Sequence, residues 1–183
     1  PGAKPLLLKL LWEPESGRVL GAQVTGFLGV DKRIDVLATA ITGGLTIDDL
    51  AQLELAYAPP FGAAKDIVNL AGFAACNARD GLVTPIDAIP DDPAVQVVDS
   101  RPAPLVQAHP LTQVRSINIP LTALRQRLGE LDRNRPVVTV CALGKTAYFA
   151  ARILAQNGFQ VSTLTGGIRA HFDPRSPAKL PTP

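Results

Sequence analysis

The first half of the chain carries strand-like and then helix-like patterns of apolar and polar residues. Apolar runs at 4–12 and 18–27 predict two β-strands, and the polar, glycine-containing segment between them predicts a hairpin turn. Apolar residues then recur at helical spacing in three further segments, 31–42, 46–54 and 66–79. We therefore expect an α+β unit in which an antiparallel sheet packs against helices.

Two local motifs add detail to this unit. Thr46 is followed three residues later by Asp49, the spacing of a capping box at the start of a helix. Residues 57–62 contain Pro59 and Pro60, which fix φ and remove two backbone donors, so we expect a rigid loop there.

The pattern changes after a segment rich in proline and aspartate at 83–93. Short apolar runs now alternate with helical spacing, and the run 137–140 has the β-branched composition of a buried strand. The predicted strands are 94–99, 116–120, 137–140 and 160–164, and the predicted helices are 121–131 and 146–157. Alternating strands and helices favour an α/β unit with a parallel sheet. We thus divide the chain into a first domain at 1–82, a linker at 83–93 and a second domain at 94–183.

Composition excludes several classes of function. The 183 residues carry a net charge of +2, with seven Lys and Arg against ten Asp and Glu up to Pro90, and eleven against six after it. The second half should attract anions, but its basic residues are scattered and not interleaved with aromatic rings, so we expect no nucleic-acid partner. No apolar run approaches the ~20 residues that span a bilayer, so we expect no membrane partner. Two cysteines and two histidines are too few for a structural zinc site, so we expect no metal.

The segment after the buried strand carries the most informative chemistry. Cys141 ends the strand, Gly144 allows the following turn, and a helix is expected to start two residues later. Backbone N–H groups of Ala142, Leu143, Gly144, Lys145 and Thr146 could form a cradle for an anion or a persulfide. The positive helix end and Lys145 would stabilise negative charge on the Cys141 sulfur, which makes this residue a candidate nucleophile.

Three reactions compete for this loop. Gly144-Lys145-Thr146 matches the end of a nucleotide-binding P-loop, but that motif requires glycine where Thr139 stands. A cysteine phosphatase requires an arginine where Ala147 stands, to grip phosphate through two hydrogen bonds. Sulfur transfer requires only the nucleophile and the cradle, so the residues favour a cysteine that carries a sulfane sulfur.

Four further residues carry expectations. We expect Asp99 and Arg101 to form a structural ion pair at a strand end, and Cys76 to pack in a core among alanines. Arg169 follows a predicted strand and could face the Cys141 loop. The two cysteines, without a disulfide-rich pattern, suit a reducing cytoplasm.

The second half resembles a rhodanese domain over about 97–171. Order and spacing match in six segments, 98–101, 117–120, 141–144, 150–154, 157–159 and 164–167. The resemblance implies that Cys141 carries the transferred sulfur. The family often has arginine at the sixth loop position, where this chain has Thr146, so the preference for thiosulfate as donor stays open.

The first half resembles the C-terminal dimerisation domain of FAD-dependent pyridine nucleotide–disulfide oxidoreductases, of the coenzyme A-disulfide reductase and NADH oxidase branch. The matching segments are 1–3, 21–23, 32–35, 53–62, 65–66 and 68–72. The resemblance implies a homodimer, in which Tyr57 and Phe61 contact the partner's active site. It also implies that this domain is incomplete at its N-terminus and that FAD and NAD(P) domains precede it.

Together the two resemblances imply one enzyme. It would use NAD(P)H and FAD to reduce CoA disulfide, CoA persulfide or polysulfide, and Cys141 would pass sulfur as a persulfide. Its partners would be small sulfur-containing substrates, with coenzyme A as ligand, and the chain alone would lack the redox centre and bind no cofactor. The alternative is an inactive rhodanese-like regulatory or interaction module on a dimerisation scaffold, with Thr146 marking the loss of activity.

Overall fold

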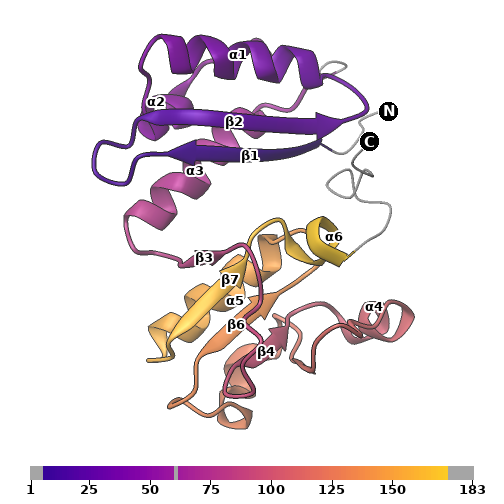
Figure 1. Cartoon of the computed structure of the whole chain (residues 1–183). Coiled ribbons are helices and arrows are strands. Elements are labelled where there is room, and N and C mark those ends of the chain that lie inside the picture. Colours follow the sequence, from indigo (N-terminus) through magenta and orange to yellow (C-terminus); the bar gives the residue numbers. More distant parts are fainter. Residues whose placement is uncertain (1–5, 60–61, 173–183) are drawn as a thin grey trace. The chain divides into compact units, whose positions relative to one another are not determined.

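A computed structural model of the chain describes residues 6–59 and 62–172 (Figure 1). The chain divides after Gly81 into two compact units. Each unit has its own apolar core, so each is described by itself.

The first unit is built on a hairpin. Strands β1 (Leu6–Trp12) and β2 (Val19–Gly26) pair antiparallel, with Leu8 opposite Val24, and the register shifts between Leu11 and Trp12. The turn closes because the Gly17 amide donates to the Glu13 carbonyl at 2.8 Å and the Glu13 amide donates to the Arg18 carbonyl at 2.9 Å. The predicted hairpin is confirmed.

Three helices complete this unit. They are α1 (Val30–Thr42), α2 (Ile47–Gln52) and α3 (Ile67–Arg79), and the capping box predicted at Thr46 and Asp49 is present. Helix α1 contacts β2, α3 contacts β1, and α2 contacts α3. The shared core is apolar: Val19, Leu37, Ala40, Ile47, Leu50, Val68 and Ala75. The α+β class with an antiparallel sheet is therefore confirmed.

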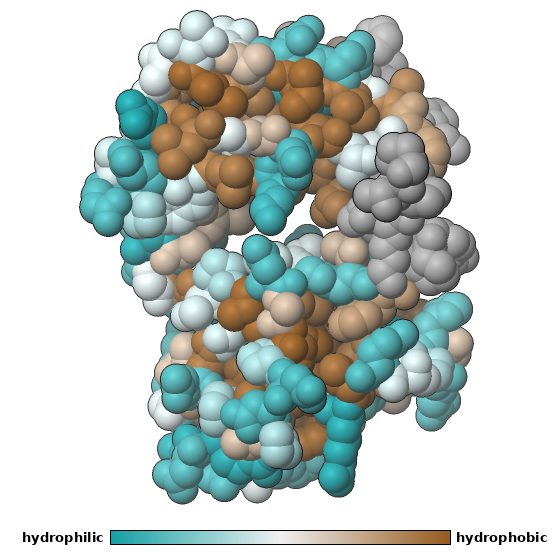
Figure 2. Space-filling view, in the orientation of Figure 1, coloured by the Kyte–Doolittle hydropathy of each residue, from teal (hydrophilic) through white to brown (hydrophobic). Residues whose placement is uncertain are grey.

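Apolar residues also lie on the outside of the first unit. Figure 2 shows brown side chains gathered over the hairpin and α1. The exposed large side chains of the hairpin and of the turn after it are Leu11, Leu20, Phe27 and Leu28. A surface of this kind suits burial against another protein surface.

The second unit contains a five-stranded sheet in the order β3-β7-β6-β4-β5, and every pair is parallel. The strands are β3 (Pro85–Ile86), β4 (Gln96–Asp99), β5 (Ser116–Asn118), β6 (Val137–Val140) and β7 (Val161–Leu164). Its helices are α4 (Ala103–Ala108), α5 (Lys145–Gln156) and α6 (Gly167–Phe172). The predicted α/β unit with a parallel sheet is confirmed.

Both faces of this sheet are buried, which explains why apolar and polar residues do not alternate along β6. Val98 and Val137 pack on one face with residues of α5, among them Ala150 and Leu154. Val97 and Val138 pack on the other face, where Ile168 and Phe172 of α6 join them.

The structure differs from the sequence prediction in three places. Residues 121–131 form two 3₁₀ turns, Leu124–Gln126 and Leu128–Glu130, and not one α-helix. Residues 85 and 86, inside the predicted linker, form the edge strand β3. Helices α4 and α6 were not predicted. Helix α4 has no buried residue, so it leaves no apolar periodicity in the sequence, and α6 begins at Gly167, a residue type that is unfavourable in helices.

Candidate functional site

Cys141 lies at the carboxyl end of the central strand β6 (Figure 1). From β4 the chain moves outward to β5, and from β6 it moves to β7 on the other side, so the strand order reverses between β4 and β6. Ligands of open α/β sheets bind at the carboxyl ends of the strands where this reversal occurs. The fold therefore places Cys141 at the expected position of a binding crevice.

The loop after Cys141 turns the backbone N–H of Gly144 toward its sulfur. The Gly144 amide donates to Sγ at 3.1 Å, and Gly144 has φ 95°, which a residue with a Cβ rarely adopts. Helix α5 begins at the next residue, Lys145, so its positive end also lies beside the loop. Only 3% of the Cys141 surface is exposed, so a reagent must reach the sulfur through the mouth of the loop.

The first turn of α6 supports the same loop from the other side. The Ile168 amide donates to the Cys141 carbonyl at 2.8 Å, and the Arg169 amide donates to the Ala142 carbonyl at 3.1 Å. Arg169 thus meets the loop through its backbone, while its side chain is exposed. Sequence reasoning singled out the arginine but missed this role of its N–H group.

Within the loop itself, residues 141–146, Lys145 is the one residue with a charged side chain. Thr146 Oγ1 lies 3.4 Å from Oγ of Ser100, which also lies 3.0 Å from the Val140 carbonyl. Leu143 is 64% exposed, and Lys145 is exposed without a partner among residues 6–59 and 62–172. Ser100 is a contact that the sequence did not reveal, because it depends on how β4 and β6 align.

A buried polar network holds the end of β4 beside the loop. The guanidinium of Arg101 donates to both carboxylate oxygens of Asp99, at 2.6 to 3.0 Å, and to the His109 carbonyl at 3.0 Å. The Asn118 amide donates to the carbonyls of Asp99 and Arg101 at 2.8 and 2.9 Å. The predicted ion pair is confirmed, and it fixes the backbone on either side of Ser100.

The other candidate residues lie in the first unit. Cys76 packs against that unit's core, as predicted, and burial together with the nearby Asp48 carboxylate raises the pKa of its thiol. Cys76 and Cys141 are both free thiols. Tyr57 is 53% exposed, and Phe61 lies outside the described residues.

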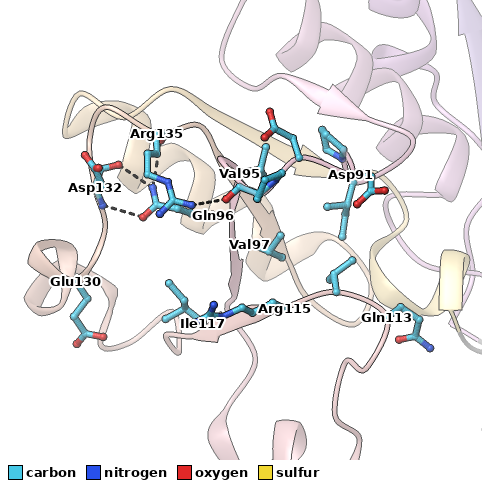
Figure 3. Close-up of a pocket in the computed structure, with 15 residues that line it drawn as sticks. Asp91, Val95, Gln96, Val97, Gln113, Arg115, Ile117, Glu130, Asp132 and Arg135 are labelled. Carbon is cyan, nitrogen blue, oxygen red and sulfur yellow. Dashed lines mark hydrogen bonds between the residues drawn. The ribbon is translucent and has the colours of Figure 1, made fainter.

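A cavity of the second unit lies away from the Cys141 loop. It measures about 640 Å³ and opens at the amino ends of β4 and β5, opposite the end that carries Cys141 (Figure 3). Its buried polar side chain, Gln96, already bonds the backbone of Asp132, accepting from the amide at 2.9 Å and donating to the carbonyl at 2.8 Å. The described residues that line it include no cysteine, serine or threonine, so the candidate site remains the Cys141 loop.

The part of the chain that the structure describes holds neither a metal cluster nor a membrane span. No group of three or more His, Cys, Asp or Glu side chains gathers among these residues to hold a metal ion. Nor is any helix among them both long enough and apolar enough to cross a membrane.

Two protein-family models match the chain. The model of the pyridine nucleotide-disulphide oxidoreductase dimerisation domain matches residues 1–67, and the model of the rhodanese-like domain matches residues 84–172. The first match lies within the first unit and ends at the start of α3, and the second match lies within the second unit.

Similar proteins support both matches. The coenzyme A disulfide reductase of Staphylococcus epidermidis is 45% identical over 75 residues, which is 41% of this chain and 17% of that protein; the Staphylococcus aureus protein of the same name is 44% identical over the same length. The structure of reduced CoADR-RHD from Bacillus anthracis aligns with TM-score 0.84 and 42% identity over 92% of this chain and 30% of that one. The NAD-dependent persulfide reductase from A. fulgidus aligns with TM-score 0.81 and 43% identity over 89% and 29%. The chain spans less than a third of the length of each of these proteins.

Proposed function

Because the chain belongs to the pyridine nucleotide-disulphide oxidoreductase family, with a dimerisation domain followed by a rhodanese-like domain, we propose that it is the C-terminal part of a persulfide-handling reductase. The whole enzyme would reduce CoA disulfide, CoA persulfide or polysulfide with NAD(P)H and FAD. Cys141 would carry the sulfur. The observation that carries the proposal is the N–H group of Gly144 directed at the Cys141 sulfur.

The transfer step needs no external oxidant. The Cys141 thiolate attacks the outer sulfur of a persulfide R–S–SH, a bond forms between Sγ and that sulfur, and the donor's S–S bond breaks. The donor leaves as the thiolate R–S⁻, and Cys141 becomes a persulfide. An acceptor thiolate then takes the outer sulfur by the same reaction and regenerates the Cys141 thiolate. Backbone N–H groups stabilise the negative sulfur both when Cys141 accepts the sulfur atom and when it passes the atom to the acceptor.

The loop's side chains favour an organic persulfide or a polysulfide as donor. Thr146 is neutral and its hydroxyl lies beside Ser100. Position 146 therefore provides no guanidinium to bind thiosulfate, a dianion, through two hydrogen bonds. Exposed Leu143 offers apolar contact to an organic donor, and Lys145 offers one positive charge. Coenzyme A, which carries its thiol on an organic arm and has anionic phosphates, would be a ligand of this chemistry.

The residues of this chain do not fit FAD or NAD(P)H. The sequence contains no Gly-x-Gly-x-x-Gly fingerprint with which a dinucleotide pyrophosphate is usually bound. The two cofactors of the proposed enzyme would therefore be held by other domains of the whole protein. We assign no residue of this chain to either of them.

The first unit would form a homodimer. Its family model is that of a dimerisation domain, and its hairpin carries exposed apolar side chains (Figure 2). Tyr57, which is half exposed, and Phe61 would contact the partner's active site. A reducing compartment such as the cytoplasm suits two free thiols, one of which must stay reduced between turnovers.

A sulfur-transfer assay tests the proposal. The chain is mixed with CoA persulfide or polysulfide as donor and dithiothreitol as acceptor, and sulfide release is followed. The matched variants are Cys141→Ser and Cys76→Ser, each of which removes one of the two thiols. We expect Cys141→Ser to fall to the uncatalysed rate and Cys76→Ser to keep the rate of the unmodified chain.

One alternative has an observation in its favour. Thr146 stands where the rhodanese family often has arginine, which would fit an inactive module with a regulatory or binding role. Equal rates for the unmodified chain and Cys141→Ser, with every donor, would support that alternative and reject sulfur transfer.

A further inference from the structure

Gly167, the first residue of α6, lies against the Cys141 loop with no room for a side chain. A Cβ atom at this position would stand 2.6 Å from the Cys141 carbonyl oxygen, 2.6 Å from the Gly144 nitrogen and 2.7 Å from the Leu143 nitrogen. All three neighbours are backbone atoms, which cannot swing aside as the end of a long side chain can. The close approach therefore depends on residue 167 being glycine.

The close contact between Gly167 and the Cys141 loop determines how the peptide groups of the loop are oriented. With Gly167 in contact, the amides of Ile168 and Arg169 reach the carbonyls of Cys141 and Ala142. A carbonyl held toward α6 keeps the rest of its peptide plane fixed as well. The N–H of Gly144, which belongs to the peptide unit directly after that of the Ala142 carbonyl, is then directed at the Cys141 sulfur.

We propose that Gly167 is a positioning residue for Cys141: its missing side chain lets α6 hold the loop so that the backbone N–H of Gly144 faces the reacting sulfur. This inference rests on the proposed sulfur-transfer function and adds a residue that does not itself touch the substrate. The expected consequence of adding a methyl group is a loop moved away from the sulfur.

The chain offers a matched control in Gly158. Gly167 and Gly158 both have positive φ, 66° and 81°, so alanine strains the backbone at either position. A Cβ at Gly158, however, would meet nothing within 4 Å. Comparing Gly167→Ala with Gly158→Ala thus separates the close approach from the general cost of alanine at positive φ.

The experiment measures how fast Cys141 accepts sulfur. Both variants are made in the whole chain carrying Cys76→Ser, and the gain of one sulfur atom from polysulfide is followed by intact mass over a range of pH. Thermal unfolding confirms that each variant is folded at the assay temperature. Loading of the parent protein is measured first, because its failure would reject the proposed function and not the role of Gly167.

We expect Gly167→Ala to load about tenfold or more slowly, the effect of losing a hydrogen bond to a charged reacting atom. The loading rate of Gly167→Ala should also begin to rise at a higher pH than the loading rate of the parent, because the Gly144 N–H stabilises the negative sulfur less well. Gly158→Ala should lower the unfolding temperature but leave both the rate and its pH dependence unchanged. Equal loading by Gly167→Ala and the parent, with the same pH dependence, would overturn the proposal.

A second measurement applies if Gly167→Ala does not fold. Backbone amide NMR signals of the Cys76→Ser protein are compared before and after sulfur is loaded on Cys141. We expect the signals of Gly144, Ile168 and Arg169 to shift together, because one hydrogen-bonded arrangement joins them to the sulfur. Shifts confined to residues 141–144 would contradict a link through α6.

Discussion

The amide nitrogen of Gly144 lies 3.1 Å from the sulfur of Cys141, across a turn of three residues. The sulfur thus faces a backbone donor close to the start of α5 at Lys145, and the second residue of that helix, Thr146, has a neutral side chain. Only a substitution by proline removes a backbone N–H group, whereas the side chains that select the donor can be exchanged freely. This division between a backbone cradle and side-chain selectivity leads to the first prediction.

Thr146→Arg should improve the use of thiosulfate. A guanidinium at this position can bind an anionic sulfonate through two hydrogen bonds, which a lysine ammonium does less well. We expect kcat/KM for thiosulfate to rise about tenfold with Thr146→Arg and by less with Thr146→Lys, consistent with one charge-assisted hydrogen bond. Initial rates with thiosulfate and with CoA persulfide measure the effect. An unchanged thiosulfate rate in Thr146→Arg would show that position 146 does not select the donor.

Asp99→Asn should destabilise the second unit. Asp99 is fully buried and Arg101 is 6% exposed, so removing one charge leaves the other buried and unpaired. Breaking such a pair costs about 3–5 kcal/mol. Hydrogen exchange of the β4 and β6 amides measures the loss.

The control for Asp99→Asn removes both charges. The double variant Asp99→Leu with Arg101→Leu leaves no unpaired charge, so it should lose less protection than the single variant. If the β4 and β6 amides of Asp99→Asn exchange as slowly as those of the unmodified chain, the ion pair does not stabilise the second unit.

Much of this fold follows from local sequence signals. The hairpin and the helix caps depend on residues close in sequence, such as Thr46 with Asp49, so their geometry could be predicted. The leucines of the predicted helix 121–131 do face a core, since Leu124 and Leu131 are buried and the other two pack against them. The helix type was wrong because Gly129 interrupts the segment and the Arg127 guanidinium bonds the Asn118 carbonyl, a contact made only in the folded unit.

The Cys141 site was predictable in its residues but not in its geometry. The spacing of Cys141 and Gly144 after a buried strand identified the loop. The contacts made by Ser100 and Gly167 depend on how separate strands and helices meet, and no local pattern encodes that alignment. Helix α6 left one signal, the apolar spacing of Ile168 and Phe172, which both pack on the sheet.

Asp66→Asn should change how the first unit responds to acid. Burial raises the pKa of the Asp66 carboxyl, but hydrogen bonds from the Arg33 guanidinium and the Val68 amide outweigh it and lower the pKa below the ordinary value. A carboxylate with a lowered pKa stabilises the fold above its ordinary pKa, and this stabilisation is lost as the pH falls through the lowered value. The unmodified chain should therefore be more stable than Asp66→Asn near neutral pH, and the difference should shrink below about pH 4.

Urea unfolding followed by Trp12 fluorescence measures this difference, because Trp12 packs against the core of the first unit and is the only tryptophan in the sequence. Asp80→Asn is the control, since Asp80 pairs with Arg79 at an exposed position where ion pairs add little. A gap between Asp66→Asn and the unmodified chain that stays constant from pH 7 to pH 3 would contradict the assigned role of the Asp66 charge.

The most direct test of the account is the mass of Cys141 after exposure to CoA persulfide. The chain is treated with the donor, blocked at its remaining thiols, digested and analysed by mass spectrometry, with Cys76 as an internal reference whose thiol has a raised pKa. The account predicts one additional sulfur atom on the peptide that contains Cys141 and none on the peptide that contains Cys76. An unmodified Cys141, or equal modification of the two cysteines, would contradict the claim that the loop after β6 is built to accept sulfur.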